Sequence, residues 1–228
     1  MKTIYALLAA GIAVIAANPA FAQDAGQQTP AQAFSGAHVE ATFGWDHFNT
    51  KSLKDIDPTA ETEAGADGVT YGGAIGYDIP LGTNLTAGGE VGLYGSSIKW
   101  MNTTNLNPGT FNTAQVNAGR DIYVGARLGY ALNAKTQIYA KAGYTNQLFG
   151  VFGTDGNNTL YQGIDASGFR LGTGIEQKLT KATYVKLEYD YSHYGSGQFN
   201  YAGTSPDGST FDLHNDQHQI LASVGLRF

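Results

Sequence analysis

The sequence contains no cysteine among its 228 residues. Disulfide bonds therefore contribute nothing to its stability. If the chain is exported, its fold must be held by hydrogen bonding and packing alone, or by a lipid bilayer.

Long apolar runs and positive charge are also scarce. Beyond the N-terminus, no segment approaches the roughly 18 apolar residues that a transmembrane helix needs. Any crossing of a membrane would therefore use β-strands. Lysine and arginine number 13 against 19 acidic residues, which gives a net charge of −6 and argues against a nucleic-acid partner.

The N-terminus has the three parts of a secretory signal peptide. Lys2 supplies the positive charge, residues 4–17 form the apolar stretch, and Ala20-Phe21-Ala22 fits a cleavage site. We expect residues 1–22 to be removed on export. Residues 23–33 are small and polar, which predicts a disordered periplasmic linker, and residues 34–228 form one domain.

Apolar residues recur at every second position in the rest of the chain. The 31 glycines disfavour helices, and the 14 tyrosines suit strands with aromatic borders. The alternation predicts eight strands. They cover residues 37–45, 69–79, 85–93, 122–130, 138–144, 169–179, 185–191 and 216–228.

The connections between these segments alternate in length. Short turns are expected at 80–83, 132–135 and 179–182, and long polar connections at 49–68, 96–119, 150–167 and 195–215. This pattern predicts an all-β fold, an eight-stranded antiparallel up-and-down transmembrane β-barrel with short periplasmic turns and four long outer loops.

Alternation alone also fits a soluble barrel that binds a ligand inside, as lipocalins do. The less apolar face separates the two, because its glycine, serine and threonine suit a crowded lumen better than a solvated exterior. Aromatic residues near strand ends on the apolar face then form girdles at the membrane surfaces. They are Phe43, Trp45, Tyr77, Tyr130, Tyr189 and Phe228.

Charged residues on the lumen face predict an ion-pair network, because unpaired buried charges are costly. Three acids and three bases are expected near one level, which are Glu40, Glu90, Arg127, Lys141, Lys186 and Glu188. Arg170 and Asp190 are expected above them, and Glu176 and Arg227 below. The network either merely fills the barrel or acts as a charged gate.

The last strand has one wholly apolar face that ends in a C-terminal aromatic residue. Its members are Ile220, Ala222, Val224, Leu226 and Phe228. Such a strand resembles the recognition strand of bacterial outer-membrane barrels, which implies that the barrel-assembly machinery reads it.

Three patterns in the sequence contain residue types that occur in catalytic or metal sites. Ser192 and His193 are the residue types of barrel enzymes that deacylate lipid A, but adjacent strand residues point to opposite faces. His214, Asp216 and His218 alternate, which places all three on one strand face as in some metal sites, but polar residues are expected at this strand end in any case. The acidic residues between 51 and 67 suit either divalent cations or simple solvation.

Three stretches resemble the small outer-membrane barrels of the porin family and opacity-protein type of alphaproteobacteria, relatives of the OmpA-like transmembrane barrel. They are residues 127–146, 169–197 and 218–228. The family commonly has a basic residue where Asp190 stands, so the pairing at that level departs from the pattern.

The resemblance implies an outer-membrane location, a role in the envelope, surface antigenicity and, in some members, limited pore activity, and it brings no catalytic motif. We expect no cofactor. Expected partners are outer-membrane lipid, lipopolysaccharide and the barrel-assembly machinery. We therefore expect a non-enzymatic barrel that contributes to envelope integrity. The alternatives are a small porin for small solutes, and an adhesin or phage receptor that acts through its loops.

Overall fold

A computed structural model describes residues 28–52, 62–101, 112–154, 158–200, 210–211 and 214–228. The predicted signal peptide and residues 23–27 of the predicted linker lie outside this part of the chain. No helix in the described part is long and apolar enough to span a membrane.

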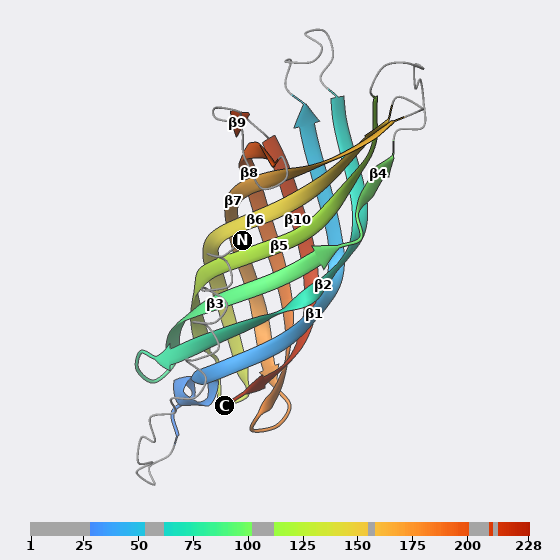
Figure 1. The fold of residues 1–228 in the computed structure, drawn as a ribbon. Helices are drawn as coiled ribbons and strands as arrows, with labels where there is room; N and C mark the ends of the chain where they lie inside the picture. The colour runs from blue at the N-terminus through green and yellow to red at the C-terminus, as the bar shows by residue number, and fades with distance from the viewer. Residues whose placement is uncertain (1–27, 53–61, 102–111, 155–157, 201–209, 212–213) are drawn as a thin grey trace.

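Eight long antiparallel strands form the wall of a closed barrel (Figure 1). They are β1 (Gly36–Ser52), β2 (Thr62–Pro80), β3 (Leu85–Ser96), β5 (Asn112–Ala131), β6 (Thr136–Thr154), β7 (Thr159–Lys178), β8 (Thr183–Asn200) and β10 (His214–Arg227). Two short strands extend the wall, β4 (Lys99–Met101) beside β5 and β9 (Thr210–Phe211) beside β8. The predicted fold class is confirmed.

The first and last long strands close the barrel. β10 pairs with β1 from His38↔Arg227 onward, and along its other edge it pairs with β8. Every long strand therefore has a partner on both sides. Closure matters because an open strand edge cannot satisfy its backbone hydrogen bonds inside a lipid bilayer.

The apolar face of each strand points outward. Phe43 is 63% exposed and Leu93 is 57% exposed, whereas Glu40 on the opposite face of β1 is buried. A soluble ligand-binding barrel would show the reverse arrangement. The outward apolar belt therefore contradicts the lipocalin-like alternative and fits a wall that faces lipid.

The two ends of the barrel differ. The short-turn end carries the predicted tight connections 80–83, 132–135 and 179–182, and lies at the lower left in Figure 1. At the opposite end, called here the loop end, the strands run further than the sequence indicated. β6 ends at Thr154 and β7 begins at Thr159, so most of the predicted loop 150–167 is strand.

The chain enters the barrel through a short 3-10 helix, η2 (Ala31–Phe34). Ala31, Ala33 and Phe34 are buried, and the amide of Ala31 donates to the carbonyl of Thr83 at 2.9 Å. Residues 31–33 were predicted to be disordered linker. That prediction is wrong for them, because Phe34 anchors the turn against Ala131 inside the short-turn end.

A glycine connects η2 to β1. Gly36 has a φ of 104°, in the region that favours glycine. This conformation lets the chain turn from the inside of the barrel into its wall, beside Phe228, the residue that follows β10.

Candidate functional site in the barrel interior

The interior at the short-turn end holds two arginines and two carboxylates, here called the base section: Asp78, Arg127, Glu176 and Arg227. Glu176 bridges the arginines, with Oε2 2.5 Å from Arg127 Nη2 and Oε1 3.1 Å from Arg227 Nη2. Asp78 Oδ2 lies 2.9 Å from Arg227 Nη1. The four groups are buried and their charges cancel, which is the condition for keeping them inside a protein.

The helical turn η2 closes the base section from below. Arg227 Nη1 donates to the carbonyl of Phe34 at 2.6 Å, and Lys178 Nζ donates to the carbonyl of Ala33 at 2.5 Å. Backbone carbonyls that end a short helical turn need such donors when they are buried. The N-terminal turn and the last strand therefore hold each other at the bottom of the lumen.

The central section consists of two lysines among four carboxylates: Glu40, Glu90, Lys141, Lys186, Glu188 and Asp190. Lys141 Nζ lies 2.7 Å from Glu188 Oε1 and 3.0 Å from Asp190 Oδ2. Lys186 Nζ lies 2.7 Å from Glu40 Oε1. Both lysines also approach Glu90, at 3.4 and 3.7 Å. The lysines thus tie strands from opposite sides of the barrel together.

Neutral donors offset the excess of carboxylates in the central section. Tyr139 donates to Glu188 Oε2 at 2.5 Å, and Tyr184 donates to Glu40 Oε2 at 2.9 Å. Their rings occupy space left by glycines, because a Cβ on Gly225 would overlap the Tyr184 ring. Glycine on the lumen face thus makes room for aromatic hydrogen-bond donors, as the composition of that face indicated.

The upper section, toward the loop end, is the pair Asp121 and Arg170. Their ion pair measures 2.5 Å between Arg170 Nη2 and Asp121 Oδ2. Ser192 Oγ accepts from Arg170 Nε at 2.7 Å, and Thr145 Oγ1 donates to Asp121 Oδ1 at 2.6 Å. Amide and hydroxyl side chains continue the polar filling, for example Gln217 Nε2 donating to Asp46 Oδ1 at 2.8 Å.

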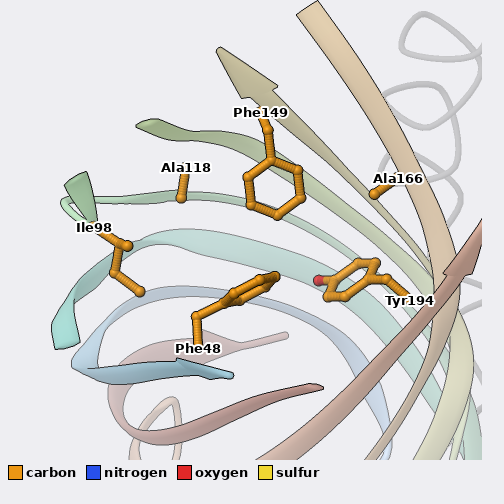
Figure 2. Close-up of a cluster of buried hydrophobic side chains, with 6 residues drawn as sticks. All are labelled: Phe48, Ile98, Ala118, Phe149, Ala166 and Tyr194. Carbon is orange, nitrogen blue, oxygen red and sulfur yellow. The ribbon is translucent and has the colours of Figure 1, made fainter. Parts of the chain in front are cut away.

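Above this level the interior becomes apolar. Figure 2 shows the apolar cap, in which the rings of Phe48, Phe149 and Tyr194 point toward one another inside the ring of strands. The ring centroids of Phe48 and Phe149 are 5.2 Å apart, and those of Phe48 and Tyr194 are 6.1 Å apart. The remaining members of the cap are Ile98, Ala118 and Ala166. Aromatic rings thus fill the described interior above the upper section.

The structure places all ten residues of the predicted network in the interior, and each makes at least one ion pair. Two of these residues lie at a different height along the barrel axis from the one predicted. Arg127 pairs with Glu176 and not with the central carboxylates, and Asp190 pairs with Lys141 in the central section. The long side chains reach along the barrel axis, which counting along strands does not capture.

Four buried acidic or histidine residues of the interior were not singled out from the sequence: His38, Asp46, Asp78 and Asp121. His38 lies between two acids, with Nδ1 3.5 Å from Asp78 Oδ2 and Nε2 3.9 Å from Glu90 Oε2. His38 and Asp78 do fall on the lumen face of the predicted strands. Asp121 immediately precedes a predicted strand, and a longer strand would have included it.

The candidate chemistry of the outer wall does not form an enzyme-like site among the described residues. Ser192 points inward to Arg170, whereas His193 lies on the outer wall with Nδ1 2.8 Å from Asp216 Oδ1. The predicted placement on opposite faces is confirmed. His218 contacts Tyr189 at 2.8 Å. The side chain of His214 and most of the acidic stretch 51–67 lie outside the described residues.

Metal coordination has no candidate in the part of the chain that the structure describes. No group of three or more histidine, cysteine, aspartate or glutamate side chains there could hold a metal ion. Asp216, which belongs to the alternating pattern noted in the sequence, accepts a hydrogen bond from Tyr191 at 2.7 Å.

The apolar face of the last strand is exposed on the outer wall. Its residues alternate with buried ones such as Leu221. The exposed set is Ile220, Ala222, Val224, Leu226 and Phe228. The six predicted girdle aromatics are also exposed on this wall. An apolar outer surface around a polar interior is what a barrel that faces lipid requires.

Comparison with known families agrees with this architecture. The family model described as outer membrane protein beta-barrel domain matches residues 6–228. The chain belongs to this family. The outer membrane is therefore the location of the barrel, and its apolar belt faces lipid. No curated protein matches the sequence.

Three solved outer membrane proteins are among the structures to which this chain is similar. Neisserial surface protein A is 14% identical with a TM-score of 0.51, over 85% of this chain and 98% of that one. The attachment invasion locus protein Ail of Yersinia pestis is 10% identical with a TM-score of 0.44, over 85% and 99%. The outer membrane protease OmpT of Escherichia coli is 10% identical with a TM-score of 0.42, over 85% and 97%. At 14% identity, the likeness to Neisserial surface protein A shows the fold and not the activity.

Proposed function

We propose that this outer membrane barrel is a closed, non-enzymatic structural protein that contributes to envelope integrity and exposes its loop end at the cell surface. The observation that carries the proposal is the continuous filling of the lumen. From η2 through the base, central and upper sections to the apolar cap, buried side chains occupy the described interior.

The ion pairs argue against the small-porin alternative. A hydrated solute could pass only if pairs such as Arg127–Glu176 and Lys186–Glu40 separated. Each separation would leave buried charges without partners, at a cost of several kcal/mol. The same pairs join strands across the barrel, so they stabilise the wall while they block the lumen. A filling role explains these pairs better than a charged gate does.

The proposal includes the partners that the sequence suggested. Outer-membrane lipid and lipopolysaccharide surround the apolar belt, and the signal peptide directs export. The exposed face from Ile220 to Phe228 is the segment that the barrel-assembly machinery reads. Binding of a host or phage partner would depend on the connections at the loop end. Residues 53–61, 102–111 and 201–209 of those connections lie outside the described chain.

A strain that lacks the gene tests the envelope role. We expect the strain to become more sensitive to detergent and to large antibiotics, and to regain resistance when the wild-type protein is supplied. A filled barrel contributes as a structural element, so a variant with a disrupted base section should restore resistance less well at equal outer-membrane abundance. Unchanged sensitivity of the deletion strain would contradict the role in integrity.

A further inference from the structure

The outer wall contains a hollow where β2, β3 and β5 meet near the loop end. Its volume is about 500 Å³ and it opens outward. Tyr71, Gly95 and Arg120 lie side by side across the three strands, because Gly95 is the register partner of both neighbours. The central position has no side chain. The Tyr71 ring lies over Gly95, and the hollow, here called the wall hollow, is bounded by this ring and by Arg120.

A β-bulge gives Arg120 its outward position. The pairing of β5 with β6 passes from Ala118↔Phe149 to Asp121↔Gln147, so Gly119 and Arg120 together oppose one residue. Such a bulge shifts the phase of a strand and redirects a side chain. Ala118 consequently lies in the apolar cap, while the Arg120 side chain is 39% exposed on the outer wall.

Arg120 retains donors for a ligand. Its Nη1 donates to Asn146 Oδ1 at 3.1 Å, and its Nη2 donates to Asp165 Oδ1 at 3.3 Å. A guanidinium has five N–H donors, and these two contacts hold it in place without using all of them. Asp165 balances part of the charge. Its ion pair with Arg120 is 3.3 Å long and partly exposed, so a doubly charged phosphate can compete for the guanidinium.

The wall hollow lies at the border between the apolar belt and the polar rim. Leu93 below it is exposed on the lipid-facing wall. On the side of β6, Tyr144 and Ser167 form a hydrogen bond of 2.7 Å, and Asn146 Nδ2 donates to Ser167 Oγ at 3.2 Å. Polar contacts begin at this height, which is where lipid head groups lie around a membrane barrel.

We propose that the wall hollow binds the phosphate-bearing head group of a glycolipid of the outer leaflet. Arg120 forms charge-assisted hydrogen bonds with the phosphate, the Tyr71 ring packs against the sugar, and Leu93 contacts the first part of an acyl chain. Arginine suits phosphate because its planar donors match phosphate oxygens in pairs. The inference rests on the proposed placement of the loop end at the cell surface.

Native mass spectrometry of the purified full-length protein in detergent tests the site, with lipopolysaccharide as the probe. Arg120→Gln should weaken binding about tenfold, because it removes a charge-assisted contact. The matched control is Lys135→Gln, which removes one positive charge from an exposed turn at the opposite end of the barrel. We expect the control to bind like the wild type.

Gly95→Leu tests the wall hollow itself, because the added side chain occupies the hollow and the positive charge of Arg120 is retained. A Cβ at Gly95 would contact the exposed Tyr71 ring at 3.1 Å, and this ring can turn aside on the surface. The variant should fold, as judged by its mobility on a gel with and without boiling, and should also lose binding. Lipopolysaccharide stripped of phosphate should bind the wild type and Arg120→Gln equally.

Two results would overturn the inference. One is equal binding of phosphorylated lipopolysaccharide by the wild type and Arg120→Gln. The other is equal binding of phosphatidylglycerol, which would show a general anion effect and no glycolipid site. Either result leaves the closed lumen intact, because lumen closure is measured separately by conductance.

Discussion

In the base and central sections charged side chains fill the lumen, whereas in the apolar cap aromatic rings fill it. Glu176 contacts two arginines, and Lys141 contacts three carboxylates. Phe48 contacts only other rings and aliphatic groups within its cluster. Both regions lie on the inward face of the same strands. The alternation of the sequence therefore does not distinguish the charged filling from the aromatic filling.

The difference lies in the consequence of losing one member. Removing one partner from a buried ion pair leaves the other charged and unsolvated, and the effect extends to every group in the section. Removing an aromatic ring leaves a cavity whose cost depends on how far the surroundings relax. The ionic sections are therefore the more sensitive part of the interior, and the apolar cap is the more tolerant part.

The largest effect is expected for Glu176→Gln. The substitution keeps the shape of the side chain but leaves Arg127 and Arg227 with Asp78 as their shared acid. We expect the free energy of unfolding to fall by about 4 kcal/mol, as for other broken buried pairs. Urea unfolding in lipid vesicles measures it. A loss of less than about 1 kcal/mol, the range of exposed pairs, would remove the distinction between the two regions.

Phe34→Ala tests the turn that closes the base section. The Phe34 ring is fully buried against Ala33 and Ala131, so we expect a loss of about 3 kcal/mol for a large aromatic truncation. The same urea titration applies. A stability equal to the wild type would mean that η2 does not contribute to the folded barrel.

Phe48→Ala tests the apolar cap. We expect a loss of about 2 kcal/mol, below the usual range for buried phenylalanine, because the loop end can relax around the cavity. The variant should also remain closed to ions, since the ionic sections are unchanged. If Phe48→Ala cost more than Glu176→Gln, the order of sensitivity would be reversed.

The smallest effect is expected for Asp67→Asn on the outer wall. Asp67 is 65% exposed and pairs with His47 at 2.8 Å. Exposed pairs contribute at most about 1 kcal/mol, so we expect a change near the limit of detection. This variant is the control for Glu176→Gln, because both replace an acid by its amide and differ in burial.

The sequence predicted the wall and the charged filling because both follow from a period of two. Glu40 and Lys186, distant in sequence, were assigned to the same lumen from alternation alone. Alternation shows which face of the strand a side chain lies on, but not how far the side chain extends along the barrel axis or which partner it contacts. The pairing of Arg127 with Glu176 and of Asp190 with Lys141 therefore needed the structure.

Other features could not be predicted because they interrupt the two-residue alternation or lie outside the segments that show it. The bulge at Gly119 and Arg120 shifts the phase of β5, which hid Ala118 in a predicted loop. Phe149 and Tyr194 lie beyond the predicted strands 138–144 and 185–191, so the apolar cap was not recognised. Residues 31–33 are small and polar in context, and only their contacts inside the barrel show that they belong to the fold.

Conductance across a planar lipid bilayer tests the closed lumen most directly. The purified full-length protein, shown to be folded by its mobility on a gel with and without boiling, is added to the bilayer under voltage. We predict no steady openings for the wild type, and brief openings for Glu176→Gln, whose base section has lost its neutrality. Large, long-lived openings of the wild-type protein would contradict the filled lumen and support the small-porin alternative.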